Sequence, residues 1–299
     1  MDLLKAMQTF VATIEVGSLV AAADRLGTSS AAVSRQISAL EAHLGARLLM
    51  RTTRRQALSP MGEEFYNRAR LILADMAEAE AVIGAQATKA KGVLRVNAPL
   101  SLGITRLSRW LPKFAMQNPE LRLDIDLTDR LVDLAAEGVD VALRIGRQPG
   151  ANSVIARKIA PIQMIVCASP AYFDTHGEPE TPEDLARHKT LSYSYLASNN
   201  SWTLSKAGSE EVTVQIDPLI SATNGDILRE FAIAGFGVIV QPTFIVDHAL
   251  AQGLLRPALT DWTMEGFSLY AVYSSRTFVP LKVRLLIDFL LAETCGKPI

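Results

Sequence analysis

Side chains suited to binding a nucleic-acid backbone gather at one point of this sequence. Between residues 47 and 58 the chain carries four arginines and no acidic residue: Arg47, Arg51, Arg54 and Arg55. A guanidinium group donates paired hydrogen bonds to phosphate oxygens, so this cluster suits contacts with a nucleic-acid backbone. An ordinary solvated surface turn is the alternative interpretation.

The segment just before this cluster has an unusual distribution of side-chain sizes. On a helix drawn at about 100° per residue, one apolar stripe contains Val33, Ile37, Leu40 and Leu44. The opposite side holds Ala31, Ser34, Arg35, Ser38 and Ala42. Small residues let a helix approach a flat partner closely, whereas a solvated face would carry more Glu and Lys. We predict that Ser30, Ala31, Ser34 and Arg35 reach base edges or phosphates, with guanine and phosphate as equal alternatives for Arg35.

Later residues have the chemistry to hold a small anion. Ser101 lies between a strand-like run and a helical pattern, and Asn224 opens a second helix in the same way. The free N–H groups at a helix start attract anions, although plain helix capping is an equally good explanation. Arg144 and Arg147 flank Gly146 after another strand and could pair with a carboxylate. A surface ion pair with an aspartate such as Asp129 or Asp133 is the alternative.

Enzymatic chemistry has little support. Pro99–Gly103 lies at a strand-to-helix turn, as a hydrolase nucleophile would, but begins with Pro where the nucleophile motif has Gly. The possible bases His176, His188 and His248 lie in no recognisable motif. Gly235-Phe-Gly237 follows a helix and precedes a strand, the wrong order for dinucleotide binding. The four His and two Cys lack metal-ligand spacing. We therefore expect no enzyme, cofactor or metal.

Short helices should position the first group of residues. Apolar residues recur at helical spacing from Leu3 to Ile14, and Ser18 can cap a short helix over Leu19–Leu26. Gly27 supplies a left-handed turn, and Ser29 or Ser30 caps a third helix that ends at Gly45. This helix, tight turn and helix predict a helix-turn-helix DNA-binding unit.

A two-stranded wing and a long helix should follow. Leu48–Leu49 and Ala57–Leu58 flank the arginine cluster, and Ser59-Pro60 begins a helix that continues to Ile83. Coiled-coil spacing is kept by Phe65, Ala69, Ile72, Met76, Ala79 and Ile83. We favour a helix that pairs two protomers over one that packs only on its own domain.

The rest of the chain changes character. Residues 84–92 read as a linker, and strand-like runs then alternate with helical patterns over about 200 residues. This alternation predicts a largely parallel, doubly wound α/β unit, and its length suits two lobes separated by a cleft.

Composition excludes several classes of protein. With 299 residues, 49% hydrophobic residues and a net charge of −1, the chain suits two folded domains without a field that attracts DNA as a whole. No apolar run would span a bilayer, and the N-terminus lacks a signal-peptide pattern. The isolated Cys167 and Cys295 cannot form a disulfide framework. We expect a cytoplasmic, nucleoid-associated protein without a membrane partner.

Together these patterns resemble the LysR-type transcriptional regulators. The match is densest over residues 18–62, at Ser18, Ala22–Ala23, Leu26, Ser34–Ile37, Leu40–Glu41, Leu44–Gly45, Arg47–Leu48, Arg51–Arg54, Leu58–Ser59 and Gly62. Residues 94–103, 128–146, 168–173 and 234–242 extend it to the C-terminal part. One departure is Ser29–Ser30–Ala31, where the family often has Ser-Gln-Pro, so a Gln that could contact a base edge is missing.

The resemblance implies a fold in three parts. Residues 1–59 would form an all-α winged helix-turn-helix domain, and residues 60–91 a dimerisation linker helix and hinge. Residues 92–299 would form an α/β effector-binding domain like the two-lobed type II periplasmic binding proteins, with lobe one at 92–161 and 268–299 and lobe two at 162–267. A periplasmic transport protein would share the second fold, but it has no use for residues 1–91 and needs an export signal.

The resemblance also implies sites and partners. DNA contacts would come from Ser29, Ser30, Ala31, Ser34, Arg35, Gln36, Arg51, Thr52, Arg54 and Arg55. Effector contacts would come from Ser101, Leu102, Arg144, Gly146 and Asn224. The expected partners are operator DNA with an inverted repeat, a small carboxylate or aromatic effector, and further copies of the chain in a dimer or tetramer. RNA polymerase is left open as another partner.

Overall fold

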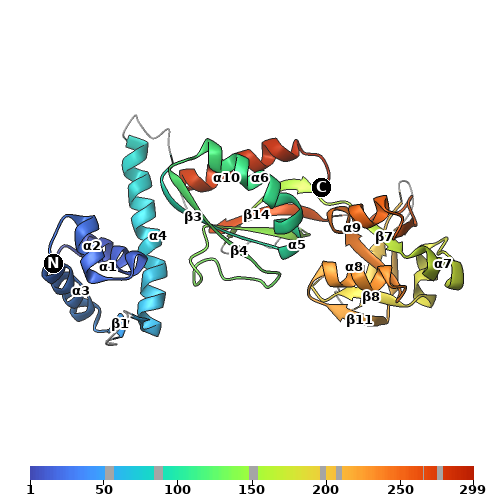
Figure 1. Cartoon of the computed structure of the whole chain (residues 1–299), viewed down its shortest axis with the longest axis horizontal. Helices are drawn as coiled ribbons and strands as arrows, with labels where there is room; N and C mark the ends of the chain where they lie inside the picture. Colours follow the sequence, from blue (N-terminus) through green and yellow to red (C-terminus); the bar gives the residue numbers. More distant parts are fainter. Residues whose placement is uncertain are drawn as a thin grey trace. The chain divides into compact units, whose positions relative to one another are not determined.

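The chain divides into two compact units, shown in Figure 1. The computed structural model describes residues 1–50, 57–83, 90–147, 154–195, 200–206, 211–264, 266–274 and 279–299. The first unit comprises Met1–Ala90, Val132–Val139 and Arg276–Leu281, and the second comprises Lys91–Leu131, Asp140–Ser275 and Lys282–Ile299. No helix in the described ranges is long and apolar enough to cross a bilayer.

Capping residues set the helices of the first unit where the sequence predicts them. They are α1 (Leu3–Val16), α2 (Leu19–Leu26) and α3 (Ser30–Leu44). The side chains of Ser18 and Ser29 accept hydrogen bonds from the first turns of α2 and α3. Gly27 adopts φ 63° at the end of α2, a left-handed conformation that directs the chain into α3. The predicted helix-turn-helix is confirmed.

The predicted wing and long helix are also present. Strands β1 (Leu49–Met50) and β2 (Ala57–Leu58) pair antiparallel, and α4 spans Pro60–Ile83. Helix α4 begins where the Ser59 hydroxyl oxygen accepts from the Gly62 N–H at 2.9 Å. The arginines between the two strands, with Thr52, lie outside the described residues.

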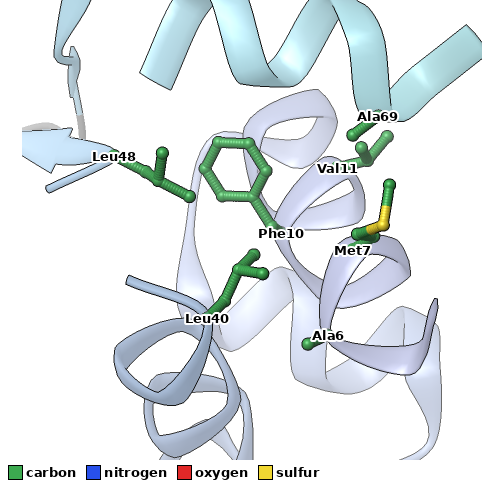
Figure 2. Close-up of a cluster of buried hydrophobic side chains, with 7 residues drawn as sticks. All are labelled: Ala6, Met7, Phe10, Val11, Leu40, Leu48 and Ala69. Carbon is green, nitrogen blue, oxygen red and sulfur yellow. The ribbon is translucent and has the colours of Figure 1, made fainter. Parts of the chain in front are cut away.

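One aromatic residue organises the core of the first unit. Phe10 of α1 is fully buried, and its ring lies 5.7 Å from that of Phe65 and 6.5 Å from that of Tyr66, both on α4. Leu40 from α3, Leu48 beside β1 and Ala69 from α4 complete the buried cluster (Figure 2). Helices α1, α3 and α4 and the start of the wing therefore share this core, and a second buried cluster of Ala22, Ala23, Val33 and Ile37 packs α2 on α3.

Two details of the predicted apolar stripes are wrong. Leu44, expected to continue the stripe of Val33, Ile37 and Leu40, is 38% exposed because α3 ends at this residue, beyond its contact with α1. Phe65 and Ala69, expected in a seam between protomers, pack instead on the core of their own domain.

The second unit contains two mixed sheets. The first has the order β4-β3-β5-β14-β6, formed by β3 (Gly92–Ala98), β4 (Leu121–Leu127), β5 (Val141–Gly146), β6 (Val154–Pro161) and β14 (Ser268–Ser274). Strand β3 pairs parallel with β4 and β5, whereas β14 pairs antiparallel with β5 and β6. A helical segment follows β3 as α5 (Leu100–Leu102), a π-helical turn η1 (Gly103–Leu107) and α6 (Ser108–Gln117), and α10 covers Leu281–Thr294.

The second sheet repeats this mixture. Its order is β11-β8-β12-β7-β13, formed by β7 (Met164–Ala168), β8 (Thr190–Tyr193), β11 (Pro218–Ala222), β12 (Val238–Pro242) and β13 (Arg256–Ala258). A separate hairpin pairs β9 (Ser201–Leu204) with β10 (Val212–Gln215). The helical elements are α7 (Pro170–His176), the 3₁₀ helix η2 (Pro182–Arg187), α8 (Gly225–Ile233) and α9 (Thr243–Ala251).

The strand pairings correct one expectation. Each sheet has two parallel and two antiparallel pairings, so the unit is an α/β fold of mixed rather than largely parallel sheets. Antiparallel strands enter because β14 inserts between β5 and β6 in the first sheet, and β7 joins β12 and β13 in the second.

Candidate functional site

One face of α3 presents small polar side chains to solvent. Val33, Ile37 and Leu40 are buried, and Ser30, Ala31, Ser34, Arg35 and Ser38 are exposed. Ser29 is exposed as well, and its hydroxyl oxygen accepts from the Ala32 N–H at 3.2 Å. Apart from Arg35, these exposed side chains are short, so this surface suits close contact with a groove edge.

Gln36, also predicted to contact DNA, lies at the boundary of this face. Its Oε1 accepts a hydrogen bond from the hydroxyl of Thr9 on α1, which is itself 2% exposed. The amide oxygen is therefore engaged within the domain, and a contact with DNA would fall to the amide nitrogen. Arg51, Thr52, Arg54 and Arg55 of the predicted DNA-binding set lie outside the described residues.

Two close contacts fix the start of the wing relative to α3 and α4. Glu41 Oε1 accepts from the backbone N–H groups of Leu48 at 2.8 Å and Leu49 at 3.1 Å. Gly62 of α4 lies so near the chain at Leu48 that an added Cβ would be 2.0 Å from the Leu48 carbonyl oxygen. The strand leading to the arginine cluster is therefore held from both sides.

The predicted seam along α4 is buried in its first part and exposed in its second. Phe65 and Ala69 belong to the core of the domain, whereas Ile72 and Met76 are 52% and 40% exposed. Large apolar side chains exposed in succession on one helix mark a face suited to a protein partner. The side chains of Ala79 and Ile83 lie outside the described residues.

The second unit contains a cavity of about 440 Å³ lined by residues from both sheets and the hairpin. Four of the five predicted effector contacts line it: Ser101, Leu102, Arg144 and Gly146. Asn224 is not on the lining, but the adjacent Gly225 is. Apolar walls are formed by Leu131, Met164, Trp202, Val240, Phe244, Ile245, Met264 and Phe267. A cavity of this size and composition suits a small organic molecule.

Hydrogen bonds join the two predicted helix starts beside this cavity. Ser101 Oγ donates to Asp226 Oδ2 at 2.5 Å, and Asn224 Nδ2 donates to Asp129 Oδ2 at 3.0 Å. The Leu100 N–H donates to the other oxygen of Asp129 at 3.2 Å. Asn224 also caps α8 by accepting from the Asp226 N–H, so capping, the alternative reading of this residue, is one of its roles.

Arg144 is part of a hydrogen-bonded group at another side of the cavity. Its Nη1 donates to Asn97 Oδ1 at 2.6 Å and to the Leu143 carbonyl at 2.9 Å. Burial, and then the nearby Asp129 carboxylate, raise the pKa of the Tyr193 phenol, so Tyr193 lines the cavity as a neutral hydroxyl. Arg147 is exposed and lines the same cavity.

Three further residues belong to this site, and two of them, Trp202 and Asp129, line the cavity. Trp202 is 5% exposed and forms part of the apolar wall. Asp129 had a usable signal: it follows β4, the parallel neighbour of β3, so it must lie near Ser101 at the carboxyl ends of both strands. Asp226 stands two residues after the predicted helix start at Asn224.

Comparison with known proteins defines the class of the molecule. Residues 4–63 match the bacterial regulatory helix-turn-helix of the lysR family, and residues 87–295 match the LysR substrate binding domain. An HTH-type transcriptional regulator of Xanthomonas campestris pv. campestris is 36% identical over 95% of this chain and 83% of its own length. The regulator CrgA of Neisseria meningitidis serogroup B is 34% identical over 96% of this chain and 95% of its own.

Solved structures agree with these sequence matches. The structure of CrgA from Neisseria meningitidis, described as a LysR-type transcriptional regulator, gives a TM-score of 0.59 at 34% identity and covers 97% of this chain and 98% of that one. The full-length Vibrio cholerae virulence activator AphB gives 0.59 at 28% identity, covering 97% and 99%. The fold is thus that of a transcriptional regulator with a DNA-binding and an effector-binding domain. This chain belongs to the LysR family.

Proposed function

We propose that this LysR-family regulator binds an inverted-repeat operator as a dimer or tetramer, and that it responds to a small aromatic or carboxylate effector bound in the cavity of its second unit. The observation that carries the DNA-binding part is the exposed face of α3, where Ser30, Ala31, Ser34 and Arg35 stand opposite the buried stripe. Two such faces related by a twofold axis would require an operator with twofold symmetry.

Self-assembly through α4 is supported by its exposed apolar residues. Ile72 and Met76 lie one helical turn apart and are exposed, whereas Leu73 between them packs against the core of the domain. Pairing this part of the helix with a second copy would bury both side chains. Because its target is DNA, we place the protein in the cytoplasm at the nucleoid, with RNA polymerase as a further partner.

A binding role for the cavity is supported over a catalytic one. The Ser101 hydroxyl donates to a carboxylate rather than to a histidine. His176 and His188 pack around Tyr172, and no histidine is among the described residues that line the cavity. A hydrolase nucleophile at Ser101 would need a base within hydrogen-bond reach.

The elements that meet at the cavity suggest how effector binding would be transmitted to the DNA. Residues after β3 and residues of α8 contribute contacts across it, so a ligand that favours one separation of these elements would change how copies of the chain assemble and thereby bend or relax the DNA. Such a ligand must bind the two states with unequal affinity. Identical small-angle scattering and identical DNase footprints with and without a bound effector would contradict this mechanism.

The DNA-binding assignment is tested with Arg35→Ala on an operator identified by genomic footprinting. For four to six phosphates neutralised per dimer, log affinity against log salt should have a slope of about −4 to −5. If Arg35 contacts phosphate, the variant dimer loses two such contacts and the slope weakens by about 1.8. If Arg35 contacts guanine, affinity falls at least tenfold and discrimination at that base pair is lost.

A matched control removes a different arginine from the same unit. Arg68 on α4 is exposed and pairs with Glu64 at 2.9 Å, so Arg68→Ala should leave operator affinity and its salt slope unchanged. Fluorescence anisotropy at several salt concentrations measures both quantities. A wild-type protein with a flat salt response, or an Arg35→Ala variant with wild-type affinity, would remove this surface from the interface.

A further inference from the structure

The hydrogen-bond donors predicted to hold an anionic effector already bind carboxylates of the protein itself. Ser101 Oγ donates to Asp226 at 2.5 Å, and Asn224 Nδ2 and the Leu100 N–H donate to the two oxygens of Asp129 at 3.0 Å and 3.2 Å. Asp226 is further held by Arg229, whose Nη1 lies 2.7 Å from Oδ1. The hydrogen-bond donors at the Ser101 end of the cavity are therefore already occupied by two carboxylates of the protein.

At the Ser101 end an effector carboxylate would meet the like charge of Asp129, which lines the cavity, and a Ser101 hydroxyl already bonded to Asp226. It would have to displace Asp129 and Asp226 from donors that they already occupy, and the displaced carboxylates would then need new partners in a partly buried place. A group that donates a hydrogen bond and has no negative charge would instead find acceptor oxygens there. Two arginines line the cavity. Arg144 has its Nη1 engaged by Asn97 and the Leu143 carbonyl, and Arg147 is exposed, so solvent and salt screen its charge.

Gln241 of β12, by contrast, offers a hydrogen-bond donor that lacks an acceptor in the described chain. This residue lines the cavity and is 1% exposed, and within the described chain its Nε2 has no hydrogen-bond acceptor. An unsatisfied buried amide donor costs about 1–3 kcal/mol in typical proteins, so a ligand oxygen that reached it would gain affinity. Trp202, Phe244 and Phe267 supply the apolar walls around these polar points.

We propose that Asp129 and Asp226 determine effector specificity: they exclude a carboxylate from the Ser101 end of the cavity and select an uncharged aromatic compound. Its N–H or O–H group donates to Asp129, which lines the cavity, while Asp226 occupies the Ser101 hydroxyl, and the ligand's oxygen accepts from Gln241. This inference rests on the proposed function of the cavity and narrows the two effector classes to one.

The test uses two aromatic probes of the same shape that differ in charge. Benzamide presents an uncharged N–H donor and a carbonyl acceptor, whereas benzoate presents only a carboxylate. Dissociation constants are measured on the full chain by ligand-observed NMR, without DNA. We expect the wild-type protein to bind benzamide at least tenfold more tightly than benzoate.

Two double variants separate charge from shape. In D129A/D226A the Ser101, Asn224 and Leu100 donors are released, so benzoate should gain at least tenfold and become the preferred probe. In D129N/D226N the side chains keep their size but lose their charge, so the preference for benzamide should shrink. Asp174→Ala is the matched control: it removes an exposed acid of α7 that pairs with Arg256, and it should keep the wild-type ratio.

The outcomes are decisive in both directions. Equal or tighter binding of benzoate by the wild-type protein, an unchanged ratio in both double variants, or binding of neither probe would each overturn the specificity assignment. Circular dichroism melting of each variant shows that it is folded. Operator binding measured without any ligand tests the proposed function separately, so failure of one conclusion is distinguishable from failure of the other.

Discussion

Gly62→Ala should destabilise the DNA-binding unit although alanine is the better helix former. Gly62 lies in the first turn of α4, where an added Cβ would lie 2.0 Å from the Leu48 carbonyl oxygen and 2.8 Å from its carbon. Real Cβ atoms essentially never come closer than 3.0 Å to such atoms, so either the backbone at Leu48 or the start of α4 must move by about 1 Å.

The expected magnitude combines three effects. Overpacking against backbone costs about 1–3 kcal/mol. The Leu48 carbonyl also accepts from the Ser59 N–H at 3.0 Å, and weakening that hydrogen bond costs about 0.5–1.5 kcal/mol more. Replacing glycine by alanine within a helix returns about 1 kcal/mol. The free energy of unfolding should therefore fall by about 2 kcal/mol.

Urea denaturation followed by circular dichroism measures this change, and operator affinity measures its consequence for the wing. Because Leu48 immediately precedes β1, the strand that leads into the wing, a displaced backbone at Leu48 should also weaken operator binding. Glu63→Ala, an exposed neighbour in the same turn, should change stability by less than about 1 kcal/mol. A Gly62→Ala protein as stable as the wild type, or more so, would show that the close approach does not constrain this glycine.

Three further perturbations have definite expected outcomes. Phe10→Ala removes the fully buried ring at the centre of the first unit and should cost about 3–5 kcal/mol by urea denaturation. Asp140→Ala leaves Lys282, whose Nζ lies 2.6 Å from the Asp140 carboxylate, without that buried partner and should cost about 3–5 kcal/mol in the same assay. Burial raises the pKa of Cys167 to about 12, so a thiol reagent at pH 8 should modify only the exposed Cys295 until denaturant is added. Since the unfolded Cys167 ionises at lower pH than the folded one, the stability associated with this thiol should be present below pH 9 and decline toward pH 12.

The helix-turn-helix could be predicted closely because its signals are local. Ser18 and Ser29 cap helices within a few residues of themselves, and Gly27 sets the turn between them. The exposure of Leu44 was not predicted, because the apolar spacing does not show that the helix ends there and that no further turn covers the side chain. The sequence also could not show that Phe65 and Ala69 pack on their own domain while Ile72 and Met76 are exposed. Heptad spacing describes one face of a helix but not whether α1 or a second copy of the chain covers it.

The cavity could be predicted only in part because its residues meet through tertiary pairing. Ser101 follows β3 as expected, whereas Arg144 and Gly146, expected after a strand, lie in the last residues of β5; all three line the cavity. Strand β6 has a weak signal in the sequence because Arg157 and Lys158 interrupt its apolar pattern, as an exposed position at the edge of the sheet allows. The link from Ser101 to Asp226 joins residues separated by 125 positions, a distance that no local pattern describes.

The position of β14 in the sequence determines which of the two sheets can be completed first during synthesis. This strand, Ser268–Ser274, lies between β5 and β6, and β6 pairs with no other strand in the described chain. All five strands of the second sheet are encoded before it, between Met164 and Ala258. As the polypeptide leaves the ribosome, the second sheet can therefore form before the first is complete. A nonsense mutation just upstream of Ser268 would yield a product that has every strand of the second sheet. In its first sheet only β3, β4 and β5 could pair, and β6 would lack the strand that joins it to them.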